Sequence, residues 1–142
     1  VPADTTATLT AGEPRHIVLR TPPPDNLTYA DLAFDELAFQ AAPGSPVRIT
    51  VRPAPGAYGL IVETDTPFQK GGEITFKYAV HFHAPPDAIA RYGNALLYAR
   101  ALAIGRTGTD GTITLLPSTH PAADNVEAVL AQPGTYVVAA PR

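Results

Sequence analysis

Prolines are spread along the whole of this chain, sixteen of them in 142 residues, which is about twice the usual share. Proline has no backbone N–H and does not fit the interior of a helix, whereas turns and sheet edges tolerate it. A chain interrupted this often has little room for long helices. The prolines therefore favour short strands joined by turns.

Between the prolines, apolar side chains recur at every second position, which is the period of a strand with one buried face. The apolar face holds Val47, Ile49 and Val51 in one segment and Ile74, Phe76, Tyr78, Val80 and Phe82 in another. An Asp-Gly pair at 110–111 is typical of a hairpin turn. Further strands are expected at residues 5–11, 15–20, 59–65, 112–117 and, as a pair, 125–140.

Three segments are harder to assign. Residues 27–41 suit either a helix of about three turns or two short strands, and the strand-like surroundings favour strands. Residues 85–93 suit a short helix that begins near a proline and ends at Gly93. Residues 95–105 are rich in alanine, but Gly93 and Asn94 would interrupt a continuous helix, so we expect a strand there.

Eight to ten short strands at roughly ten-residue spacing predict an antiparallel β-sandwich. The expected fold class is all-β, immunoglobulin-like in general architecture, with at most one or two short helices. The length fits a single domain over residues 1–142. The polar, threonine-rich residues 1–12 are expected to form an edge strand or an N-terminal arm.

The composition of the chain limits the classes of partner and of chemistry that can be expected. The net charge is −3, with the charges scattered, which gives no electrostatic reason to expect nucleic acid. No apolar run approaches the roughly 20 residues that a membrane helix needs. The chain contains no cysteine, which excludes disulfides, thiolate metal sites and a cysteine nucleophile. Arginine outnumbers lysine and alanine is abundant, and from this composition we expect a bacterial protein.

The start of the chain bears on its location. The sequence begins with Val1 and contains no methionine. This start suits the residues that follow signal-peptide cleavage, and it suits a domain cut from a longer chain equally well. We expect a secreted or cell-surface protein.

The order of segments in the second half resembles a known family. The relevant stretches are PGSPVRITVRPAP, GLIVETDTPFQKGGEITFKYAV, ALLYARALAIGRTGTDGTITLLPST and NVEAVLAQPGTYVVAAP. Together, over about residues 40–142, they resemble the β-sandwich domain shared by zonula-occludens proteins, netrin receptors and ankyrins, which also occurs in bacterial surface proteins. The tryptophan frequent after the Asp-Gly pair in that family is absent here. The resemblance implies a non-enzymatic interaction or spacer module, extracellular in bacteria, with no catalytic residues.

Two histidines flank Phe82 near the end of an expected strand. Side chains two apart on a strand point the same way, so His81 and His83 suit two ligands of Zn²⁺ or Cu²⁺ if a third ligand converges. The alternation instead places both on the polar face, where they would be solvated surface residues, and this second interpretation is favoured. The candidates for a third ligand are His16, His120, Asp87 and Asp124.

Other candidate chemistry is weaker. Ser118, His120 and Asp124 lie close in sequence, but catalytic triads are assembled from separated segments and no nucleophile-elbow motif is present, so a polar loop is expected. The acids Asp31, Asp35 and Glu36 are expected on a solvated face. A carbohydrate platform needs exposed aromatic rings, for which the candidates are Tyr29, Tyr58 and Tyr92.

The sequence thus predicts a non-enzymatic, secreted or cell-surface module without a cofactor. Its expected role is structural or protein-binding, with a protein partner or self-association, as in a subunit of a surface filament. Two alternatives remain open: a metal-binding protein that uses His81 and His83, and a carbohydrate-binding module.

Overall fold

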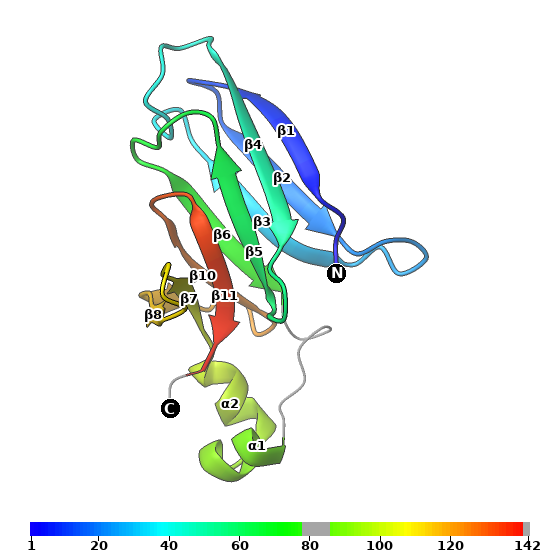
Figure 1. The fold of residues 1–142 in the computed structure, drawn as a ribbon. Coiled ribbons are helices and arrows are strands. Elements are labelled where there is room, and N and C mark those ends of the chain that lie inside the picture. The colour runs from blue at the N-terminus through cyan, green and yellow to red at the C-terminus, as the bar shows by residue number, and fades with distance from the viewer. Residues whose placement is uncertain (78–85, 141–142) are drawn as a thin grey trace.

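Two antiparallel sheets pack face to face in the computed structural model, which describes residues 1–77 and 86–140 (Figure 1). The six-stranded sheet has the order β1-β4-β5-β11-β7-β8, and the five-stranded sheet has the order β2-β3-β6-β10-β9. Every strand pairing is antiparallel. The all-β antiparallel sandwich predicted from the sequence is confirmed.

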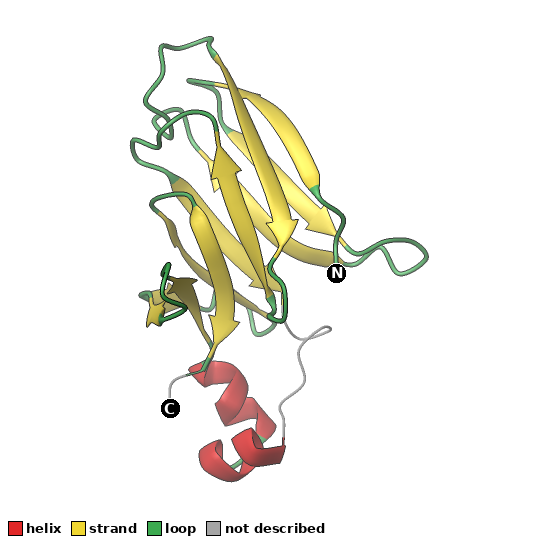
Figure 2. Ribbon diagram, viewed as in Figure 1, coloured by secondary structure: helices red, strands yellow, loops and turns green. Residues whose placement is uncertain are grey.

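The strands are short, as the turn residues predict. The six-stranded sheet consists of β1 (Thr5–Thr10), β4 (Pro46–Pro53), β5 (Gly59–Thr64), β11 (Gly134–Ala139), β7 (Ala103–Thr107) and β8 (Ile113–Leu115). The five-stranded sheet consists of β2 (Arg15–Arg20), β3 (Thr28–Phe34), β6 (Gly72–Lys77), β10 (Asn125–Leu130) and β9 (Ser118–Thr119). Figure 2 shows the two layers of strands in yellow.

The core lies between the sheets and is built from the alternating apolar positions. Removal of this apolar surface from water is the main force that holds the two sheets together. The side chains that are almost completely buried include Val47, Ile49, Val51, Leu60, Ile74, Phe76, Ile104, Val126, Leu130 and Tyr136. The alternation in β4 and β6 therefore identified the buried face correctly.

The N-terminal segment is a strand of this sandwich. β1 pairs with β4 along its whole length, from Thr5 opposite Val51 to Thr10 opposite Pro46. Leu9 reaches the core and is 2% exposed. The strand lies at the side of the molecule, at one edge of the six-stranded sheet (Figure 1).

Residues 27–41 form one strand, not two. β3 takes up the first half, in agreement with the preference for strands over a helix. The second half contains only an isolated bridge between Phe39 and Phe68. Asp35 turns the chain after β3, with its side chain accepting a hydrogen bond from the Leu37 N–H.

Two short helices lie at one end of the sandwich (Figures 1 and 2). α1 (Pro86–Tyr92) agrees with the short helix expected there. α2 (Ala95–Ala101) occupies a segment for which we expected a strand, and that prediction was wrong. Gly93, with a φ of 94°, ends α1, but Asn94 then caps a new helix by accepting a hydrogen bond from the Leu97 N–H at 2.9 Å. Only the end of the segment, in β7, is a strand.

Candidate functional site

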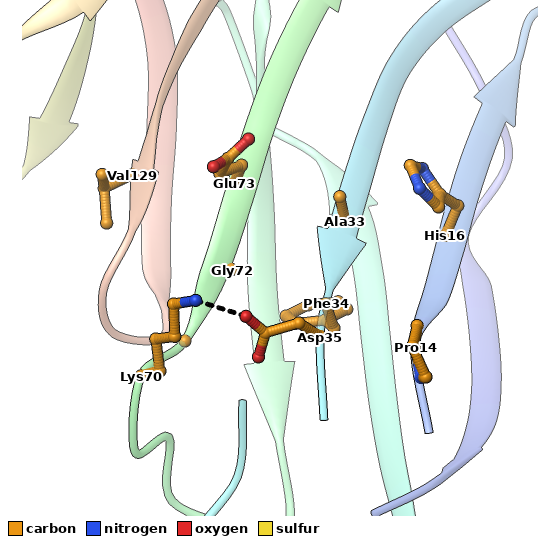
Figure 3. A pocket seen from close by; sticks show the side chains of 10 residues that line it. Pro14, His16, Ala33, Phe34, Asp35, Lys70, Gly72, Glu73 and Val129 are labelled. Atoms are coloured by element: carbon orange, nitrogen blue, oxygen red, sulfur yellow. Dashed lines mark hydrogen bonds and ion pairs between the residues drawn. The ribbon is translucent and has the colours of Figure 1, made fainter. Parts of the chain in front are cut away.

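A groove of about 330 Å³ runs across the outer face of the five-stranded sheet (Figure 3). We call it the β3–β6 groove. Ala33 is small on this face, while taller side chains rise on either side of it (Figure 3). Its lining consists of Pro14, His16, Ala33, Phe34, Asp35, Lys70, Gly71, Gly72, Glu73 and Val129.

Gly72 is required by the way the strands approach. A methyl group at this position would lie 2.3 Å from the Ala33 carbonyl oxygen and 2.8 Å from the Phe34 ring. Contacts this short do not occur between real atoms, so only glycine fits at this position. Phe34, the register partner of Gly72, is buried on the core face, so Gly72 allows β3 and β6 to pack closely beneath the groove.

Opposite charges pair at the ends of the groove. The Lys70 ammonium forms an ion pair with Asp35 (Figure 3), and this contact lowers the pKa of Asp35 and raises that of Lys70. On the other side, His16 Nδ1 lies 3.0 Å from the Asp31 carboxylate. Both contacts are exposed to solvent, where ion pairs contribute little to stability.

Glu73 and Glu127 form a second feature of this face. Register places Thr75 opposite Glu127 and Glu73 opposite Val129, so the two glutamates lie diagonally across β6 and β10. A hydrogen bond with the Glu73 carboxyl, together with partial burial and the Glu73 charge, raises the pKa of Glu127. Thr75 Oγ1 donates to Glu127 Oε2 at 3.2 Å. Glu127 therefore holds its proton more readily than an isolated glutamate would.

The chemistry of the groove is limited. No hydroxyl or thiol belongs to its lining, so it offers no activated serine, threonine or cysteine nucleophile. A shallower hollow of about 210 Å³ over β4 and β5 is lined by Arg48, Thr50, Glu63, Thr64 and Asp65. Both hollows are open to solvent, unlike the clefts that enclose most of a small ligand.

Three exposed apolar side chains lie on the two helices. We call them together the helix patch and define it by Ile89, Leu96 and Leu97, which are 39%, 60% and 46% exposed. The helices that carry it are anchored, because Ala88 and Tyr98 are buried in the core cluster. Tyr92 and Tyr98 pack together between the helices with ring centroids 5.6 Å apart. The exposed leucines are thus held on an ordered support.

The metal site predicted from His81 and His83 lies outside the described residues. The candidates for a third ligand have other contacts: His16 with Asp31, the ring of His120 with the Leu102 carbonyl at 3.0 Å, and Asp124 with Lys77 at 3.3 Å. Asp87 lies in the first turn of α1. Within residues 1–77 and 86–140, no group of three or more histidines and acids could hold a metal ion.

The other predicted site residues also have ordinary structural contacts. Ser118 Oγ donates to the Leu116 carbonyl at 2.9 Å and accepts from the Ile104 N–H at 3.0 Å. Because a hydroxyl has a single proton, this serine cannot also donate to a histidine base. Its neighbours His120 and Asp124 therefore do not activate it in this arrangement.

The three tyrosines do not make an exposed platform. Tyr29 is 2% exposed and stacks on Tyr58 with ring centroids 4.5 Å apart. Burial raises the pKa of both phenols, and their hydroxyls donate to the carbonyls of Gly59 and Lys77. Tyr92 is half-buried beside Tyr98. These rings serve the packing of the sandwich.

Sequence reasoning missed the β3–β6 groove, the Glu73–Glu127 pair and the helix patch. The groove and the pair depend on which strands are neighbours, for which the sequence carries no local signal. The helix patch had a signal in Asn94, whose side chain is a good helix cap, but we interpreted Asn94 only as a helix breaker.

Comparison of the chain with family models, with curated proteins and with solved structures gave no match. Within the described part of the chain, neither helix is long and apolar enough to cross a membrane.

Proposed function

We propose that this chain is a non-enzymatic β-sandwich module of a secreted or cell-surface protein, and that it binds a protein partner through the helix patch. The observation that carries the proposal is the exposure of Ile89, Leu96 and Leu97 on ordered helices. Exposed apolar groups on one surface commonly mark protein–protein contacts, and the two helices that carry these side chains pack against each other through Tyr92 and Tyr98. Full burial of an exposed leucine is favourable by roughly 1.5–3 kcal/mol, and Leu96 and Leu97 would gain about half of this because they are already partly buried.

The shape of the outer surface supports binding to a protein in preference to catalysis on a small molecule. The two hollows are open to solvent, and the candidate nucleophile Ser118 is engaged by backbone groups. The surface location rests on the resemblance to sandwich domains of bacterial surface proteins. The same resemblance extends the proposal to a structural subunit of a surface assembly.

Site-specific photo-cross-linking in the cells that make the protein tests the partner. A photo-reactive amino acid is placed at position 97 and, as a matched control, at the exposed position 112 in the β7–β8 hairpin. We expect a discrete cross-linked product from position 97 only, which L96D abolishes. Identical products from both positions, or none from position 97, would contradict the proposal. Removal of the protein by protease treatment of intact cells tests its surface location.

The alternative function, metal binding by His81 and His83, is tested separately. Elemental analysis is carried out on the purified wild type and on His81→Ala. Under the proposal, both contain less than stoichiometric metal. Zinc or copper at one equivalent in the wild type, lost in the variant, would replace the proposal with a metal-binding function. Binding of a defined sugar on a glycan array would support the carbohydrate alternative in the same way.

A further inference from the structure

The two sheets have four open edges among the described strands, and three of them are protected against pairing. β8 has three residues and β9 has two. β2 carries Arg15 and Arg20, and its register shifts between Leu19 and Arg20. Short length, charge and irregular register all discourage a further strand from adding to an edge.

The fourth edge, β1, has none of these protections. Its six residues, TTATLT, include no charge and no proline, and its pairing with β4 runs without a register shift. Regular, uncharged edge strands are templates for strand addition. β1 is therefore the edge of this molecule that is best suited to pair with another chain.

Two backbone hydrogen bonds show which groups point to the open edge. The Ala11 N–H donates to the Ser45 carbonyl at 2.9 Å, on the β4 side of β1. In an antiparallel strand, alternate residues direct their N–H and C=O to opposite sides. Odd residues of β1 therefore bond to β4, whereas Thr6 and Thr8 direct their backbone groups outward. Thr10 is partly engaged, because its carbonyl accepts from the Glu13 N–H at 3.2 Å.

We propose that a second copy of this chain pairs with β1 across a two-fold axis at Ala7, which joins two six-stranded sheets into one. In this register, Thr6 of each copy lies opposite Thr8 of the other. Each such pair exchanges both of its N–H···O bonds. The interface is isologous, as in most symmetric dimers. This inference goes beyond the proposed function, since it concerns a different surface.

A second copy fits this edge because β1 is its own complement. The two-fold axis keeps the exposed threonine face of one copy continuous with that of the other, and Ala7 and Leu9 remain on the core side. Asp4 falls opposite Thr10, so no like charges meet. A foreign peptide would need pockets for alternate side chains to be selected, and neither hollow contains a β1 residue.

Sedimentation velocity over a range of protein concentrations tests the proposal. Strand pairing buries little surface, so we expect a weak dimer whose population rises with concentration. The variant T6K/T8K places lysines directly opposite each other and should weaken association at least about tenfold. The matched variant T6E/T8K places glutamate opposite lysine at the same positions and should restore it. A wild type that stays monomeric, or a dimer unaffected by T6K/T8K, overturns the proposal.

Amide hydrogen exchange gives a second readout without substitution. The N–H groups of Thr6 and Thr8 should become protected as concentration rises, whereas that of Ala7, already bonded to β4, should be protected throughout. If the sample dimerises but the exchange rates of Thr6 and Thr8 do not change with concentration, the proposed interface is wrong. L96D leaves this association unchanged, so the two proposals can fail separately.

Discussion

At the scale of single residues, the parity of a position in a strand decides whether its side chain is buried or exposed. Ile74 and Phe76 are buried because they occupy the apolar positions of an alternating strand, and both are fully enclosed. Glu73 and Thr75 lie on the opposite face by the same rule. Parity does not say that Glu127, some fifty residues away in sequence, would lie beside Glu73, because that depends on the register of β10 on β6.

The glutamate pair makes stability depend on pH. The pKa of Glu127 is raised in the folded protein, so between its unfolded and folded pKa values the folded state holds more protons than the unfolded chain. The contribution of this group to folding therefore falls as pH rises from about 4.3 through the raised value. The sign is opposite to that of a carboxylate in an ion pair, such as Asp35 beside Lys70.

We predict that Glu127→Gln raises the free energy of unfolding at pH 7 by less than about 1 kcal/mol, since the pair is partly solvated. The gain should be smaller near pH 4, because the raised pKa of Glu127 leaves more of this carboxyl protonated there. Urea denaturation at the two pH values measures both effects. Glu63→Gln is the control, because Glu63 pairs with Arg52 and its removal should give no gain. A gain that is equal at both pH values would rule out the shared proton as its cause.

At the scale of elements, strands were easier to predict than helices. Alternation in β4 and β6 is a regular signal. The segment 95–101 is an alanine-rich helix in a chain made mostly of strands, and its surroundings misled the interpretation. The end of a helix at Gly93 was predicted correctly. However, either a second helix or a strand can follow such a break, and the capping role of Asn94, which distinguishes the two, was not considered.

The capping contact at Asn94 is open to test. Replacing Asn94 with alanine removes the acceptor for the Leu97 N–H and should lower the free energy of unfolding by about 0.5–2 kcal/mol. Asn94→Asp keeps a side-chain oxygen at this position and should stay close to the wild type. Chemical denaturation of the three proteins measures the difference. Equal stability of Asn94→Ala and the wild type would mean that the cap contributes nothing.

At the scale of the whole molecule, the N-terminal segment belongs to the sandwich. Leu9 and Ala11 are buried in the core cluster, and β1 covers the edge of β4. A segment with these contacts is not a free arm, and its removal would disturb folding as well as any association. This is why the dimer is better tested by substitutions at Thr6 and Thr8, whose side chains are exposed.

We predict that deletion of residues 1–12 lowers the free energy of unfolding by at least about 2 kcal/mol, the lower end of the cost of truncating one buried leucine. Urea denaturation measures it, with removal of the exposed Val1 alone as the control. If the truncated protein were as stable as the control, β1 would not be part of the folded core in solution.

The sequence by itself determined that the chain forms short strands, which side chains are buried in the regular strands, and where the hairpin after β7 turns. These properties follow from local spacing, because proline, glycine and the two-residue period act within a few positions. Only the tertiary structure decided that the β3–β6 groove lies over Gly72 and that β1 is left as an uncharged open edge. These depend on which distant strands become neighbours, and pairing between distant segments leaves no local pattern in the sequence.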